Sequence, residues 1–197
     1  MVPVVTGLRG VREEDVTNPR ESNVWMSTYT GGRFYPETLT ENEYRIEDIA
    51  HGLALQCRFG GQSREFYSVA QHSVMVSELV PPEHALWGLL HDASEAYLID
   101  LPRPIKRLQQ LEGYRSLERA VMTALLSTFG LPDTEPMDVV WADNGALVAE
   151  AKMLGLWNPH WVVALLPEAS IPSIPYSWSP LEAEARFLRR FRELNTR

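Results

Sequence analysis

Five side chains that can bind a metal or move a proton lie in otherwise apolar segments: His72, His91, Asp92, Glu95 and Asp143. Burying such a group without a partner costs roughly 2 to 7 kcal/mol, so each must find a partner in the folded chain. Two imidazoles and two carboxylates that converge between packed helices form a mixed nitrogen and oxygen site for a divalent transition metal. We therefore predict that His72, His91, Asp92 and Asp143 bind one such ion, with Co²⁺, Mn²⁺, Zn²⁺ and Fe²⁺ all compatible.

Glu95 follows His91 by four residues and Asp92 by three. In a helix this spacing places all three on one face, with Glu95 one turn further on. From there Glu95 can reach a water molecule at the metal without being a ligand itself. A metal lowers the pKa of such a water, and a nearby carboxylate can carry its proton. The arrangement predicts hydrolysis, with Glu95 as the catalytic acid and base.

Helices must position these residues. Apolar side chains recur at helical spacing in several segments, at 46–57, 67–80, 83–97, 110–129 and 136–155. A fourth helix is expected after the loop that contains Pro102 and Pro104, and His91 and Asp92 are expected inside the continuous helix 83–97. Ser179 followed by Pro180 is a typical helix start and predicts a last helix. The predicted fold class is all-α.

The two ends of the chain have a different pattern. Residues 1–23 lack a steady period, and the aromatic residues of 24–45 surround a Gly pair, which predicts a small hairpin or lid. We therefore divide the chain into an irregular extension, 1–45, and a helical domain, 46–197, whose core is 46–155. The Pro-rich segment 157–180 is expected to run extended over the surface before the last helix.

Composition excludes several classes of protein. The chain has 197 residues, 45% of them hydrophobic and 22% charged, which is typical of one folded domain. The formal net charge of −8 disfavours nucleic acid as a partner. Cys57 is the only cysteine, so neither an internal disulfide nor a cysteine-based zinc site can form. We see no apolar run of about 20 residues and no secretory signal, so we expect no membrane contact and a cytoplasmic location.

The order of these motifs resembles a known family. A helix with His72, a helix with His91-Asp92 and a later helix with Asp143 are similar to the HD-domain metal-dependent phosphohydrolases, over residues 46–155. The run from Leu90 to Glu95 and the run from Asp100 to Lys106 are most similar to the bacterial 5′-deoxynucleotidases. Phage dATP triphosphohydrolases are similar small HD enzymes. The resemblance implies an HD-domain helical bundle in which Glu95 transfers protons.

The resemblance also implies substrate contacts. It assigns the substrate phosphate to Arg58 and the deoxyribose 3′-hydroxyl to Asp100. Phe59 stands where the deoxynucleotidases have a tryptophan that crowds the 2′ position. The segment after Arg58 is one residue shorter than in the family, so Arg64 is a second candidate for the phosphate. Lys106 could add positive charge at the entrance of the substrate site, or it could balance the charge of nearby acidic residues.

The expected function is therefore cleavage of the 5′-phosphoester of a deoxynucleotide. A deoxynucleoside monophosphate would yield phosphate, and a deoxynucleoside triphosphate such as dATP would yield triphosphate. Two alternatives stay open: a metal-binding regulatory or assembly domain without turnover, and a hydrolase of another nucleotide such as guanosine tetraphosphate. The small HD enzymes of this branch form dimers or hexamers, so the resemblance also implies a homo-oligomer.

Overall fold

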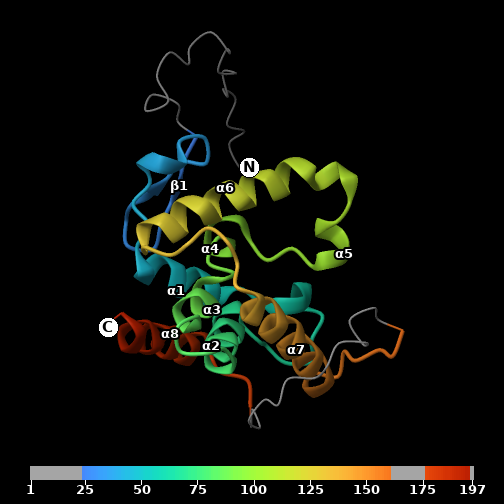
Figure 1. Ribbon diagram of the computed structural model, residues 1–197. Helices are drawn as coiled ribbons and strands as arrows, with labels where there is room; N and C mark the ends of the chain where they lie inside the picture. The colour runs from blue at the N-terminus through green and yellow to red at the C-terminus, as the bar shows by residue number, and fades with distance from the viewer. Residues whose placement is uncertain (1–23, 161–175, 196–197) are drawn as a thin grey trace, which may run out of the picture.

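The computed structural model describes residues 24–160 and 176–195, which form a bundle of α-helices with one small hairpin (Figure 1). The α-helices, in chain order, are α1 (Ile46–Leu55), α2 (Val69–Leu79), α3 (Ala85–Leu90), α4 (Glu95–Leu98), α5 (Arg103–Lys106), α6 (Glu112–Thr128), α7 (Met137–Met153) and α8 (Pro180–Leu194). Short 3₁₀ turns are η2 (Leu39–Glu41), η3 (Arg58–Gly61) and η4 (Gln109–Leu111). The all-α prediction is confirmed.

Most predicted helices are present, and their ends follow from local signals. The hydroxyl of Ser179 accepts a hydrogen bond from the backbone N–H of Glu182, and Pro180 is the first residue of α8. Ser68 caps α2 in the same way, because its hydroxyl accepts from the backbone N–H of Gln71. These caps fix where the helices begin.

The predicted continuous helix over 83–97 is wrong. Helix α3 ends at Leu90 and α4 begins at Glu95, and the turn between them carries His91 and Asp92. The Nδ1 atom of His91 lies 2.8 Å from the carbonyl oxygen of Gly88, an acceptor that a continuous helix would use for the N–H of Asp92. The N–H of Glu95 accordingly bonds the carbonyl only three residues back, at Asp92.

The N-terminal part of the described chain contains the predicted hairpin. Strand β1 (Met26–Ser27) pairs antiparallel with β2 (Arg33–Phe34), and Gly31 adopts a φ of +85° in the turn. Phe34 is only 2% exposed and stacks on Tyr97 of α4, with ring centroids 4.7 Å apart. The hairpin therefore packs into the main core. The predicted arm, 1–23, lies outside the described residues, as do residues 161–175 of the Pro-rich segment.

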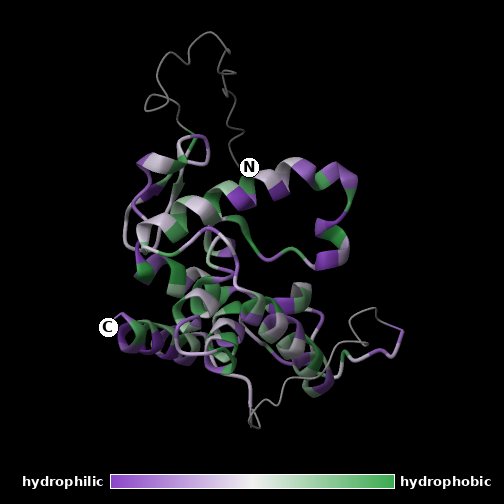
Figure 2. Ribbon diagram, in the orientation of Figure 1, coloured by the Kyte–Doolittle hydropathy of each residue, from purple (hydrophilic) through white to green (hydrophobic). Residues whose placement is uncertain are grey.

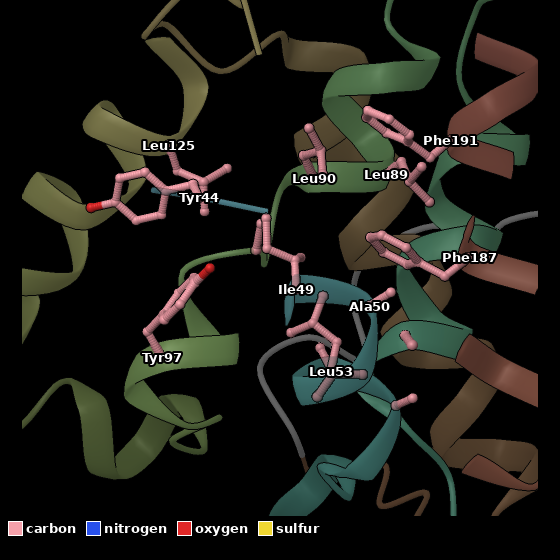
Figure 3. Close-up of a cluster of buried hydrophobic side chains, with 14 of the residues drawn as sticks. Tyr44, Ile49, Ala50, Leu53, Leu89, Leu90, Tyr97, Leu125, Phe187 and Phe191 are labelled. Atoms are coloured by element: carbon pink, nitrogen blue, oxygen red, sulfur yellow. The ribbon is translucent and has the colours of Figure 1, made fainter. Parts of the chain in front are cut away.

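Helix α2 is the centre of the bundle. It packs against α1, α3, α7 and α8, and every residue from Val69 to Ser77 is buried. The main apolar cluster fills the space beside it with side chains from α1, α3, α4, α6 and α8 (Figure 3). Helix α8 shows its hydrophilic side to solvent and buries Ala183, Phe187 and Phe191 (Figure 2). In the described residues no helix is long and apolar enough to cross a bilayer.

Candidate metal centre

The four predicted ligands come from three different parts of the bundle. His72 lies in the middle of α2 and is fully buried, His91 and Asp92 lie in the turn before α4, and Asp143 lies on α7. The Nε2 atom of His72 is 3.2 Å from Nε2 of His91 and 3.2 Å from Oδ1 of Asp143. His91 Nε2 is in turn 3.1 Å from Oδ2 of Asp92.

Three of these residues form a cluster that can hold a metal ion. His72, His91 and Asp92 each offer one ligand atom, and these atoms all lie within 4.8 Å of one another. Asp143 does not belong to this tightest group, but its Oδ1 contacts His72 from the α7 side. The structure thus brings all four predicted side chains to one place, with His72, His91 and Asp92 nearest together.

The hydrogen bonds of the two imidazoles fit a metal. His72 Nδ1 lies 2.7 Å from Oε1 of Glu150, and His91 Nδ1 lies 2.8 Å from the Gly88 carbonyl. A carboxylate and a carbonyl can only accept, so both Nδ1 atoms carry a hydrogen, which leaves the Nε2 lone pairs of the neutral rings free. Two such lone pairs facing each other at 3.2 Å need a cation between them. Imidazole and carboxylate donors suit a transition metal ion.

Without a metal, a proton takes that role. Burial acts against a charged His91, but the attraction of Asp92 and then Asp143 outweighs it and raises the pKa of His91 to about 9. Burial likewise acts to raise the pKa of both carboxyls, yet His91 holds the pKa of Asp92, and His72 that of Asp143, well below the ordinary value. The cluster therefore attracts positive charge strongly.

Asp143 has a second partner that fixes its orientation. Its Oδ2 forms an ion pair with Arg103 of α5, which also donates a 2.6 Å hydrogen bond to Asn144. Asp138, the other acid near the start of α7, pairs with His84 instead, 3.0 Å away. Of these two acids, Asp143 is therefore the one that contacts His72.

Glu95 lies at the start of α4 and is 4% exposed. Its Oε1 is 3.3 Å from Nζ of Lys106, which also bonds Glu118 of α6 at 2.6 Å. Its Oε2 is buried and has no hydrogen-bond partner in the described part of the chain. Burial, with the negative charges of Asp92 and Asp100, raises the pKa of Glu95 well above its ordinary value. Such a carboxyl is suited to take up and return a proton.

Arg58 lies beside the cluster and is almost fully buried. Its Nη1 is 3.6 Å from Oδ2 of Asp92, and its Nε is 3.2 Å from Oε2 of Glu150. Phe59 follows with a φ of +57°, a conformation that is strained for a bulky side chain, and its ring centroid is 5.4 Å from the Arg58 guanidinium carbon. Arg64 is exposed and packs against Gly155 beyond the end of α7. The structure therefore brings Arg58 to the cluster.

Asp100 is anchored by a side chain that sequence reasoning missed. Gln56 accepts a 2.8 Å hydrogen bond from the backbone N–H of Asp100 and donates a 2.7 Å bond to the carbonyl of Glu95. Burial raises the pKa of Asp100, and the charge of Arg58 acts against that rise. Gln56 thus ties the start of α4 to the segment that carries Asp100.

Comparisons with known proteins place the chain among relatives. No family model matches it. It is 36% identical over 173 residues to the uncharacterized protein YfdR of Escherichia coli K12, an alignment that covers 87% of this chain and 96% of YfdR. The chain belongs to the YfdR family. It is also 35% identical over 138 residues to the uncharacterized protein RCAP_rcc00048 of Rhodobacter capsulatus, which covers 66% of this chain and 70% of that protein.

In this member of the YfdR family, Glu150 is a further buried acid beside the cluster, at a position that was not predicted from the sequence. This fully buried acid contacts His72, Arg58 and Tyr67, whose hydroxyl donates a 3.0 Å hydrogen bond to Oε1. The sequence does indicate that Glu150 lies on the same face of the helix as Asp143, because it follows Asp143 by seven residues, or two helical turns. Its neighbours Ala149 and Ala151 are apolar. The rule that selected His91 in its apolar surroundings would have selected Glu150 as well.

Proposed function

We propose that this chain is an HD-type metal-dependent phosphohydrolase that cleaves the 5′-phosphoester of a deoxynucleotide. One observation carries the proposal. Ligand atoms of His72, His91 and Asp92 gather within 4.8 Å, the buried guanidinium of Arg58 lies 3.6 Å from Asp92, and the buried carboxyl of Glu95 is near enough for the charge of Asp92 to raise its pKa. A purely structural metal site has no use for an acid with a free oxygen and a raised pKa.

Each side chain has one role in this proposal. His72, His91, Asp92 and Asp143 would hold one divalent transition metal, which supplies Lewis-acid activation of water and of the phosphoryl group. Oε2 of Glu95 accepts the proton of the attacking water and returns it to the leaving oxygen, since its raised pKa favours both transfers.

Arg58 supplies positive charge to the phosphate. A guanidinium binds phosphate oxygens in pairs and stabilises the charge that develops during transfer. Asp100 would accept a hydrogen bond from the 3′-hydroxyl of the sugar, as the family resemblance implies, and Phe59 would lie near the 2′ position. The backbone of both residues is held by the contacts of η3 and Gln56.

Charge pairing favours the monophosphate as substrate. Arg103 is paired with Asp143, and Lys106 is shared by Glu95 and Glu118. These carboxylates already balance the cations that a triphosphate tail would need. We therefore propose a deoxynucleoside and inorganic phosphate as the products, in a homo-oligomeric, cytoplasmic protein without nucleic-acid partners.

A nucleotide panel tests the proposal. The protein is stripped of metal, reloaded with Co²⁺, Mn²⁺, Zn²⁺ or Fe²⁺, and offered each dNMP, NMP, dNTP and NTP, with guanosine tetraphosphate included. Glu95→Gln is the test variant. Glu184→Gln is the matched control, because Glu184 of α8 pairs with His51 of α1 and not with any residue of the cluster.

Release of deoxynucleoside that Glu95→Gln abolishes and Glu184→Gln retains would support the proposal, and the second product would identify the phosphate chain length. Stoichiometric metal binding without turnover of any nucleotide would refute it and favour a regulatory or assembly domain.

A further inference from the structure

Glu150 connects the metal cluster to the arginine that faces it. Its side chain is fully buried on α7, and its two carboxylate oxygens point to different partners. We propose that Glu150 is a positioning residue that orients His72 and Arg58 together, so that metal binding and phosphate binding are coupled through one carboxylate. The phosphate half of this inference rests on the proposed function, whereas the metal half does not.

The first oxygen of Glu150 serves the metal ligand. Oε1 accepts from Nδ1 of His72 at 2.7 Å and from the hydroxyl of Tyr67 at 3.0 Å. This contact keeps the hydrogen on Nδ1 and directs Nε2 toward His91 and Asp143. A carboxylate behind a histidine also makes the free nitrogen a stronger donor to a metal.

The second oxygen serves Arg58. Oε2 lies 3.2 Å from the Nε atom of Arg58, as an ion pair that is not aligned for a hydrogen bond. A guanidinium is a rigid fork, so a contact at Nε fixes the direction of both Nη atoms. Nη1 accordingly lies on the side of the cluster, 3.6 Å from Oδ2 of Asp92.

Charge explains why both contacts depend on the same residue. A divalent ion would bring two positive charges beside the buried guanidinium of Arg58, and the nearby carboxylates Asp92 and Asp143 would have to balance the ion while Asp143 also pairs with Arg103. Glu150 supplies further negative charge to Arg58, because it is a fully buried carboxylate with Oε2 3.2 Å from the Arg58 Nε atom. Breaking a buried pair by removing one partner leaves an uncompensated charge, which is strongly unfavourable. Arg58 would then repel the ion.

A double-mutant cycle tests the coupling. Glu150→Gln keeps the size of the side chain and removes its charge, Arg58→Ala removes the guanidinium, and the double variant combines them. Tyr67→Phe is the matched control, since it removes another contact of Oε1 but leaves the charge. For each protein the Co²⁺ dissociation constant is measured by calorimetry, and the visible absorption of bound Co²⁺ reports its coordination. Inorganic phosphate is then titrated into the Co²⁺-saturated protein.

We expect Glu150→Gln to weaken Co²⁺ binding by about 10- to 100-fold and to alter the Co²⁺ spectrum. Phosphate binding at saturating Co²⁺ should also weaken, because Arg58 loses its anchor. Arg58→Ala should weaken phosphate binding about tenfold or more but tighten Co²⁺ binding, since a positive charge leaves. In the Arg58→Ala background, Glu150→Gln should then cost less Co²⁺ affinity than alone, because only the loss of its contact with His72 remains. Tyr67→Phe should change both affinities much less than Glu150→Gln.

Additive effects of the two substitutions on Co²⁺ binding would overturn the coupling. Thermal unfolding would show whether Glu150→Gln is folded. If it is not, Arg58→Ala alone tests the inference, and unchanged or weaker Co²⁺ binding by Arg58→Ala would overturn it. The proposed function is judged separately, by turnover. A non-additive cycle in a protein that hydrolyses no nucleotide would support the role of Glu150 and refute the phosphohydrolase. Turnover of a nucleotide with an unchanged KM in Glu150→Gln would support the phosphohydrolase and refute the role of Glu150.

Discussion

Glu95→Gln should lower activity and raise stability at the same time. The carboxyl is 4% exposed, and its Oε2 lacks a hydrogen-bond partner in the described residues. Glutamine has nearly the same shape but cannot carry a proton in the reaction, so kcat should fall by about 10² to 10⁴. The same change removes a charge that is poorly placed in a buried site. A merely structural residue in a packed core would show the opposite effect on stability.

The pH dependence gives the stability effect a magnitude. Burial, Asp92 and Asp100 raise the pKa of Glu95 in the folded protein above the ordinary 4.5, so the unfolded chain ionises first as pH rises. Above pH 4.5 the wild-type protein therefore loses about 1.4 kcal/mol of unfolding free energy per pH unit, until Glu95 ionises in the folded state. For a chain of this size that loss is about 3 to 5 °C in Tm per pH unit.

Glutamine does not titrate, so the Tm difference between Glu95→Gln and wild type should grow with pH. Thermal unfolding of the metal-free proteins, measured at several values between about pH 5 and pH 8, checks this. Glu184→Gln should keep wild-type turnover. A folded Glu95→Gln variant with kcat within tenfold of wild type would refute the acid and base role. A Tm difference that stays constant with pH would refute the raised pKa.

Three further predictions concern the cluster and its surroundings. Because the pKa of His91 is about 9, Co²⁺ binding at neutral pH should release about one proton per ion, seen by calorimetry in buffers of different ionisation heat; no release would argue against His91 as a ligand. Arg58→Ala should weaken phosphate binding about tenfold or more, and Arg64→Ala should not, as titration of the Co²⁺-loaded proteins would show. Ile99 has a φ of +67° and is 59% exposed, so Ile99→Gly should remove about 1 to 3 kcal/mol of strain, offset by about 0.5 to 1 kcal/mol of glycine entropy. A Tm of Ile99→Gly below that of the wild-type protein, measured by thermal unfolding, would contradict that estimate.

The helices with strong local signals could be predicted from the sequence. Helix α8 has a capping serine, a proline at its first turn and three buried residues on one face, so its start and its buried side both follow from spacing. Helix α2 has apolar residues all round and a serine cap, which agrees with its place at the centre of the bundle. In such segments local and tertiary preferences agree.

The segment over 83–97 shows where local reasoning fails. Its apolar period is that of one helix, but the structure interrupts it at His91 and Asp92. The backbone of His91 still turns in the helical direction, with a φ of −58° and a ψ of −31°. What changes is the partner of the Gly88 carbonyl, which His91 Nδ1 contacts at 2.8 Å. No periodicity of apolar residues can reveal a side chain that competes for a backbone acceptor.

The clustering of His72, His91 and Asp92 could be predicted because each is a polar residue in apolar surroundings, where burial without a partner is costly. The same cost applies to Arg58 and Glu150, so the same reasoning marks both as residues that need a buried partner. Glu150 is fully buried and Arg58 is 8% exposed, so each needs the opposite charge of the other to offset the cost of its burial. A metal site that must also attract an anion needs a buried cation nearby, and that cation requires a carboxylate beyond those that bind the metal. An acid two helical turns from a predicted ligand, as Glu150 is from Asp143, is therefore a residue to seek in sequences that combine a metal site with a nearby buried arginine.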